Sequence, residues 1–129
     1  MWARLHNGEK TGLMVESLLR YNTVPNLFAT HPPFQIDGNL GIVGAISETL
    51  VQSHTGTIAL LPVVMPGWAS GSVKGLRARG DVTVDFDWKA GKVTRFTLVC
   101  GSDRTVSVKV NGITKESPLK AGSRYSKSL

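Results

Sequence analysis

Apolar residues recur at helical spacing in the first half of the chain. Over residues 9–21 they fall three and four positions apart, which predicts an amphipathic helix. Its apolar positions are Leu13, Met14, Val15, Leu18 and Leu19. A second helix is expected over residues 40–52, and both of its faces are apolar. A helix that is apolar all round needs neighbours on several sides. Residues 2–5 are typical of the tail of a further helix, closed by Asn7 and Gly8.

The hydrophobic period changes from helical to two after Gly56. Alternation over 57–61, 82–88, 93–100 and 105–110 predicts strands, and Asn111-Gly112 is a strong hairpin signal. We expect these strands to form an antiparallel meander, with one or two short edge strands in the tail around Pro118 and Gly122. The chain therefore divides into a helical segment, 1–56, and a β-domain, 57–129, in an α+β fold.

The two halves of the chain differ in net charge. Residues 1–60 carry three basic and four acidic side chains, whereas residues 61–129 carry twelve basic and five acidic ones. The basic residues are dispersed among aspartates and lack the aromatic stripe of strand-binding proteins, so a solvated basic face is favoured over a nucleic-acid site.

Composition excludes several classes of protein. The one long apolar run, 58–69, contains Pro62, Pro66 and Gly67 and cannot cross a bilayer as a helix. Cys100 is the single cysteine and follows two apolar residues, so a buried strand thiol is expected. The histidines make no metal-binding pattern, and neither a cofactor nor a phosphate-binding loop is predicted. The sequence shows no secretory signal, and localisation stays open.

The most distinctive stretch is residues 31–39, HPPFQIDGN, between the two predicted helices. If the two prolines hold it extended, His31, Gln35, Asp37 and Asn39 project to one side at period two. Phe34, Ile36 and Leu40 would then anchor the other side. This arrangement presents an imidazole, two carboxamides and a carboxylate to a pocket.

Asp37 is the best candidate for chemistry, because a carboxylate before a helix N-terminus stays ionised and can orient a water as a base. The commoner role of such residues is capping, in which Asp37 or Asn39 closes the helix at Leu40. His31 could bind a substrate hydroxyl or serve only as hydrogen-bonded structure. Trp68 is the more exposed candidate for sugar stacking, since Trp88 ends an apolar stripe and is expected in the core.

These residues carry a resemblance to a known family. The stretch 31–39, together with Asn26-Leu27-Phe28, Gln52-Ser53-His54, Leu60-Leu61-Pro62, Trp68 and residues 71–80, resembles the C-terminal part of glycoside hydrolase family 95, the inverting α-L-fucosidases. The resemblance covers nearly the whole chain and favours the active-site role of Asp37 over capping.

The resemblance implies the last helices of an α/α toroidal barrel followed by a small antiparallel β-domain. It implies that Asp37 assists an upstream asparagine in activating water, and that His31 binds fucose. Gln35 and Asn39 are predicted to contact substrate on the same edge. No residue here matches the family's general acid, so the isolated chain is expected to be inactive.

The resemblance also implies a partner: a fucosylated oligosaccharide or glycoconjugate, with neither nucleic acid nor membrane. Exposed helical surface is expected to favour self-association. The family is often secreted or periplasmic. A non-catalytic carbohydrate-binding or interaction β-module is the alternative, supported by the basic β-rich half and Trp68.

Overall fold

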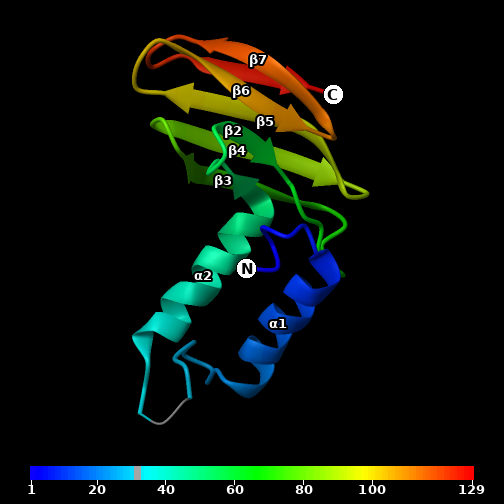
Figure 1. Cartoon of the computed structure of the whole chain (residues 1–129), viewed down its shortest axis with the longest axis vertical. Helices are drawn as coiled ribbons and strands as arrows, with labels where there is room; N and C mark the ends of the chain where they lie inside the picture. Colours follow the sequence, from blue (N-terminus) through cyan, green and yellow to red (C-terminus); the bar gives the residue numbers. More distant parts are fainter. Residues whose placement is uncertain (31–32) are drawn as a thin grey trace.

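The computed structural model describes residues 1–30 and 33–129, in which two helices precede eight strands (Figure 1). The helices are α1 (Gly8–Tyr21) and α2 (Ile36–Leu50). The strands are β1 (Val51–Gln52), β2 (Thr57–Leu60), β3 (Gly71–Ala78), β4 (Val82–Lys89), β5 (Lys92–Cys100), β6 (Arg104–Val110), β7 (Ile113–Leu119) and β8 (Arg124–Ser128). Figure 1 shows the strands stacked at one end and the two helices projecting from them. No helix among the described residues is long and apolar enough to cross a membrane.

The strands form two four-stranded sheets rather than one meander. One sheet has the order β1-β2-β6-β7 and the other β3-β4-β5-β8, and β2 and β6 are the parallel pair. The hairpins β4–β5 and β6–β7 exist as predicted, but β5 and β6 lie in different sheets, so the predicted meander is wrong. The physical reason is burial: each hairpin has one apolar face, and stacking the sheets lets the two faces cover each other.

The core lies between the sheets. Val82, Val84 and Leu98 are fully buried on one sheet, and they belong to the same cluster as Ile58 and Val108 on the other. This pattern explains why alternation identified β2, β4, β5 and β6 from the sequence. The strand β3 was not among the predicted strands, because its register shifts between Val73 and Leu76 and interrupts the period of two.

Two tryptophans join the core to the segment before β3. Trp88 is buried as predicted, and its indole Nε1 donates a hydrogen bond to the Trp68 carbonyl oxygen at 2.8 Å. Gly71 lies against the Trp88 ring, where a Cβ atom would come within 2.5 Å of a ring carbon. Trp68 packs partly buried on the core, so it is less exposed than the sequence suggested. Cys100 is buried, as predicted.

The start of the chain differs from the prediction. Residues 2–6 form turns, not the tail of a helix. Asn7 opens α1 rather than closing an earlier element, because its side-chain oxygen accepts a hydrogen bond from the Lys10 N–H at 2.9 Å. This is ordinary N-capping by asparagine, which an Asn-Gly pair disguises as a helix end. The predicted helix over 9–21 is confirmed as α1.

Both helices expose much of their apolar surface. Of the apolar residues that define α1 in the sequence, Val15 is buried, whereas Leu13, Met14 and Leu19 are exposed. On α2, the exposed apolar side chains include Ile36, Leu40 and Val43. The expectation that α2 needs neighbours on several sides is therefore not met within the described residues.

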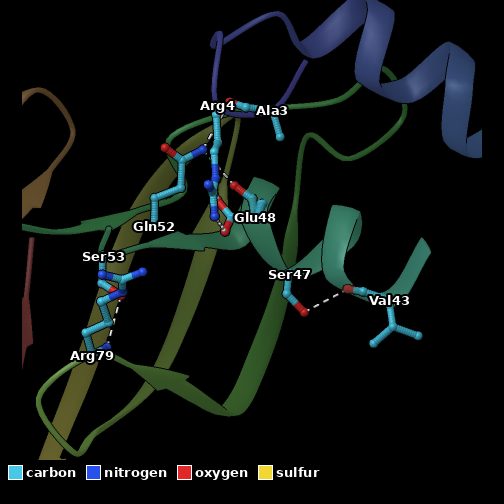
Figure 2. Close-up of polar contacts among 8 residues, drawn as sticks. All are labelled: Ala3, Arg4, Val43, Ser47, Glu48, Gln52, Ser53 and Arg79. Carbon is cyan, nitrogen blue, oxygen red and sulfur yellow. Dashed lines mark hydrogen bonds and ion pairs between the residues drawn. The ribbon is translucent and has the colours of Figure 1, made fainter. Parts of the chain in front are cut away.

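A polar joint connects the N-terminal turns, the end of α2 and the first strand (Figure 2). Arg4 donates two hydrogen bonds to the Glu48 carboxylate, at 2.6 and 3.1 Å. Gln52 donates from Nε2 to the carbonyl oxygens of Ala3 and Glu48, at 3.0 and 2.9 Å. The hydrogen bond from Arg4 holds the pKa of Glu48 below its ordinary value and that of Arg4 above its own.

Two further contacts in Figure 2 support this joint. Ser53 follows β1 directly, and its hydroxyl oxygen accepts a hydrogen bond from the backbone N–H of Arg79 at 3.0 Å. Within α2, the Ser47 hydroxyl donates to the Val43 carbonyl oxygen at 2.9 Å. The chain leaving α2 is thus tied to both the N-terminal turns and the segment after β3.

Removing a fully buried core side chain should show that the stacked sheets carry the stability. We expect Leu98→Ala to lower the free energy of unfolding by about 2–5 kcal/mol, because it removes buried methyl groups and leaves a cavity. Ile113→Ala, at an exposed position on β7, should change it by less than about 0.5 kcal/mol. Urea denaturation followed by circular dichroism measures both. Equal losses in the two variants would contradict the assigned core.

The Arg4–Glu48 pair should make stability depend on pH. Because the folded-state pKa of Glu48 is lowered, its contribution is present above the ordinary glutamate pKa of 4.5 and is lost as pH falls below that value. Glu48→Gln should cost about 0.5–1 kcal/mol at pH 7, with the difference from the unsubstituted chain closing near pH 3.

Glu16→Gln is the matched control for this measurement. Glu16 also pairs with an arginine, Arg20, but its side chain is 62% exposed against 30% for Glu48. We expect a loss of at most about 0.5 kcal/mol from this variant. A Glu48→Gln loss that is the same at pH 3 and pH 7 would show that packing, and not the ion pair, is responsible.

Candidate active-site loop

The first part of the connection between the helices, residues 22–30, is a hydrogen-bonded loop. The structure pairs Thr23 with Ala29 in an isolated antiparallel bridge. Backbone hydrogen bonds from Val24 N–H to the Phe28 carbonyl and from Thr30 N–H to the Asn22 carbonyl, at 2.9 and 3.0 Å, close it on itself. The Thr23 hydroxyl donates to the Leu18 carbonyl at 2.9 Å and fixes the loop to the end of α1. Over residues 22–30 the loop thus has its own hydrogen-bonded frame.

The predicted extended geometry is wrong after Gln35. The helix α2 begins at Ile36, four residues earlier than expected, so Asp37 and Asn39 lie in its first turns. Their side chains therefore do not alternate with those of an extended chain. The pair Gly38-Asn39 concealed this start, because glycine and asparagine are weak helix formers.

The capping interpretation is also wrong. The N-cap of α2 is Gln35, whose backbone is extended and whose side chain makes no capping hydrogen bond. Its carbonyl oxygen accepts from the Gly38 N–H at 3.2 Å. Asp37 is one residue inside the helix, so neither Asp37 nor Asn39 closes the helix at Leu40.

Asn39 ties α2 to the loop. Its side-chain oxygen accepts a hydrogen bond from the Ala29 N–H at 3.1 Å, and its Nδ2 donates to the Leu27 carbonyl oxygen. Gly38 lies on the same side, where a Cβ atom would come 3.8 Å from the Ala29 Cβ. Both hydrogen-bonding ends of the Asn39 amide thus hold the loop in place, and its predicted contact with substrate remains a prediction.

Asp37 and Gln35 are exposed at the N-terminus of α2. Among the described residues, the Asp37 carboxylate has no hydrogen bond and no ion pair. It lies at the positive end of the helix dipole, which interacts favourably with negative charge. A carboxylate in this position can accept a proton or orient a polar ligand. The predicted position of His31 falls outside the described residues.

The apolar residues around Asp37 do not anchor the loop as expected. Phe34, Ile36 and Leu40 are all exposed rather than buried against a core. The ring of Phe34 contacts that of Phe28, with centroids 5.1 Å apart. The surface around Asp37 is therefore apolar with one carboxylate and one carboxamide.

His54 and Trp68 lie away from Asp37 in the fold. His54 lies in a turn after β1, because α2 stops at Leu50, two residues before the predicted end of that helix. Trp68 lines a hollow between α1 and residues 65–68, and its backbone carbonyl is engaged by Trp88. The described residues contain no group of His, Cys, Asp and Glu that could hold a metal ion.

Sequence reasoning missed two clusters. No local sequence pattern predicts the contact between Arg4 and Glu48, because the two residues are 44 positions apart. Basic residues from five segments line two adjoining hollows beside β2 and β6, whereas their dispersal along the sequence had suggested only a solvated face.

Comparison with known proteins gives both halves of the chain the same assignment. Residues 1–50 match the family profile described as glycosyl hydrolase family 95 catalytic domain. Residues 52–127 match the profile described as glycoside hydrolase family 95, C-terminal domain.

Curated relatives agree with this assignment. The chain is 39% identical to "Alpha-L-fucosidase 2" of Arabidopsis thaliana over 95% of this chain and 16% of that protein. It is 33% identical to "Probable alpha-fucosidase A" of Aspergillus oryzae over 86% of this chain and 18% of that protein. The chain thus spans less than a fifth of the length of these relatives. On both kinds of evidence, the chain belongs to glycoside hydrolase family 95.

Proposed function

We propose that this chain supplies one wall of the active site of an inverting α-L-fucosidase, with Asp37 assisting the activation of water. The observation that carries this is the setting of Asp37, an exposed carboxylate on the first turn of α2 that forms no ion pair with residues 1–30 or 33–129. Asn39 holds the adjoining loop by two hydrogen bonds and keeps this turn in a fixed place. The relatives named as fucosidases support a fucosylated glycan as the substrate.

Inversion needs a general acid and a base on opposite faces of the sugar, with room for a water between them. The glutamates of the two helices are poorly suited to be the acid. Glu48 is bound by Arg4 and Glu16 by Arg20. Glu9 lies in the first turn of α1, the other helix. We propose that the acid, and the asparagine that Asp37 assists, come from residues beyond this chain. His31 and Gln35 would bind the sugar beside Asp37.

We also propose that α1 and α2 are the last helices of an α/α toroidal barrel. The support is the apolar surface that both helices leave exposed, which barrel neighbours would cover. The β-sandwich would then close one end of that barrel, connected to it through the Arg4–Glu48 joint.

Activity measurements test the proposal in two proteins. The 129-residue chain should release no measurable fucose from an aryl α-L-fucoside. A chimera in which this chain replaces the matching part of the Arabidopsis relative should be active. In that chimera, Asp37→Asn should lower kcat by about 100-fold or more, which is the usual contribution of acid–base assistance.

Glu16→Gln in the same chimera should retain full activity, since Glu16 forms a surface ion pair on α1. Circular dichroism checks that each variant is folded. Release of fucose by the isolated chain, abolished by Asp37→Asn, would show that the chain holds a complete catalytic site. Full activity of the Asp37→Asn chimera would remove Asp37 from the mechanism.

The exposed helical surface should make the isolated chain self-associate. In sedimentation we expect species heavier than the 13.9 kDa monomer, increasing with concentration. Leu40→Gln on α2 should shift the distribution toward monomer. Ile113→Gln on β7 should not, although Leu40 and Ile113 are similarly exposed, at 68% and 61%. A chain that stays monomeric at high concentration would count against uncovered barrel helices.

A further inference from the structure

A groove lies beside β2 and β6, and residues of the β3–β4 and β4–β5 turns also line it. It consists of two hollows of about 590 and 370 Å³, and His54 lines both. Thr57 lines the first and Ser107 the second, and their hydroxyls lie 3.4 Å apart, so the two hollows adjoin. On the face opposite the core, Thr57 and Ala59 of β2 pair with Ser107 and Lys109 of β6. Apart from Lys109, these side chains are short and form the floor. We refer to the two hollows together as the basic groove.

Every ionisable side chain that lines the basic groove is basic. Lys92, Lys109, Arg4 and His6 line the first hollow, and Arg79 and Arg104 line the second. No carboxylate lines either hollow. His54 helps to lower the pKa of Glu48, but that carboxylate lies outside both linings and is bound by Arg4. The walls of the groove therefore present an uncompensated positive charge.

The ion pairs of the β-strand half, residues 57–129, lie outside the basic groove. Each of the four aspartates of this half is paired with a cation, in the pairs Asp81–Arg77, Asp85–Arg124, Asp87–Arg95 and Asp103–Lys120. Lys92, Lys109, Arg79 and Arg104 form no ion pair within residues 1–30 and 33–129. The basic groove thus brings together four of the eight cations of the β-strand half that form no ion pair among the described residues.

Two buried nitrogens of the groove also lack a partner. His54 Nδ1 and Arg104 Nε are buried without a hydrogen bond among the described residues. A buried polar atom without a partner is unfavourable, and an anionic group in the hollow would supply a partner for an N–H there. Gly80 lets the Arg104 guanidinium approach closely, because a Cβ atom at that position would come 2.6 Å from an Arg104 nitrogen.

The chemistry of the lining favours an acidic glycan over a nucleic acid. Proteins that bind single strands stack bases on aromatic side chains, and no Phe, Tyr or Trp lines either hollow. Hydroxyls and carboxamides, from Thr57, Thr55 and Gln52 among others, alternate with the cations instead. From Lys109 to Arg104, β6 spans about 16 Å, enough for more than one anionic group.

We propose that the basic groove binds an acidic glycan through carboxylate or sulfate groups on its sugars. The choice of a glycan rests on the proposed function, whereas the need for an anion rests on the lining alone. The groove lies on the sandwich, whereas Asp37 is at the opposite end of α2, a helix about 22 Å long (Figure 1). The groove is thus an attachment site separate from the candidate active site.

Binding to the 129-residue chain tests the proposal without any hydrolysis, so it can fail independently of the fucosidase assignment. Calorimetric titration compares dextran sulfate and polygalacturonate oligomers with neutral dextran of the same length. A single-stranded oligonucleotide of equal charge is the third probe. We expect one or both acidic glycans to bind, neutral dextran not to bind, and the oligonucleotide to bind more weakly.

Matched variants locate the site. Lys92→Gln/Lys109→Gln should weaken binding of the acidic glycan about tenfold at low salt, because it removes two groove cations. Lys74→Gln/Lys127→Gln makes the same charge change outside the groove and should have less than about a twofold effect. Arg79→Gln, in the second hollow, should weaken binding at least about threefold. Of the substituted side chains, Lys127 is half-buried and the others are exposed, and the folding of every variant is checked by thermal denaturation.

The proposal is overturned if neither acidic glycan binds, or if the oligonucleotide binds more tightly than both. Equal losses in the two lysine double variants would mean attraction to net charge and no site. An unaffected Arg79→Gln variant would exclude a groove that runs through both hollows. Selective binding of the sulfated oligomer would assign the site to sulfate groups, and selective binding of polygalacturonate would assign it to carboxylates.

Discussion

The rest of the structure depends on mutual burial of two apolar sheet faces. Val82, Val84 and Leu98 on one sheet and Ile58 and Val108 on the other are each nearly or fully buried. The helices contribute little to this cluster beyond Leu50, the last residue of α2. The helix α2 is held to the sandwich by Leu50, by Ile46 and by the polar joint around Arg4 and Glu48. The helix α1 packs on residues 63–66, where Gly8 and Gly12 allow close approach. The stability of the chain lies in the β-domain, whereas the candidate chemistry lies on elements that the core barely reaches.

The burial of one face of each strand explains which elements could be predicted from the sequence. Strong alternation, as in β4, predicts a strand reliably because one face is buried and the other is solvated. The same alternation says nothing about which sheet a strand joins, so the two-sheet arrangement was missed. In β3, Gly75 at φ 75° accompanies a bulge that breaks the period. The predicted helix over 9–21 is right in extent, but its apolar face is largely uncovered, which periodicity alone cannot reveal.

For the candidate site, too, only some features could be predicted from the sequence. The sequence placed Asp37 beside a helix N-terminus, and this position agrees with the geometry, whereas its role in chemistry remains a prediction. It misplaced the start of the helix, because Gly38 and Asn39 are weak helix formers whose cost is offset by the hydrogen bonds from Asn39 to the loop. A tertiary contact between residues 27–29 and 39 therefore overrode local propensity. The substrate-binding roles of His31, Gln35 and Asn39 remain predictions.

The distribution of charge in the fold differs from the distribution that the sequence predicts. Along the chain, the basic residues of the second half alternate with aspartates, and a neutralised surface is the natural expectation. In three dimensions the aspartates bind Arg77, Arg95, Lys120 and Arg124. Of the other cations of the second half, Arg79, Lys92, Arg104 and Lys109 line one groove, whereas Lys74, Lys89, Lys115 and Lys127 lie outside it. Pairing thus leaves four cations together in one groove, on the sandwich and away from Asp37. Since like charges at close range repel one another, such a concentration is unfavourable in the free protein, and an anionic ligand relieves it.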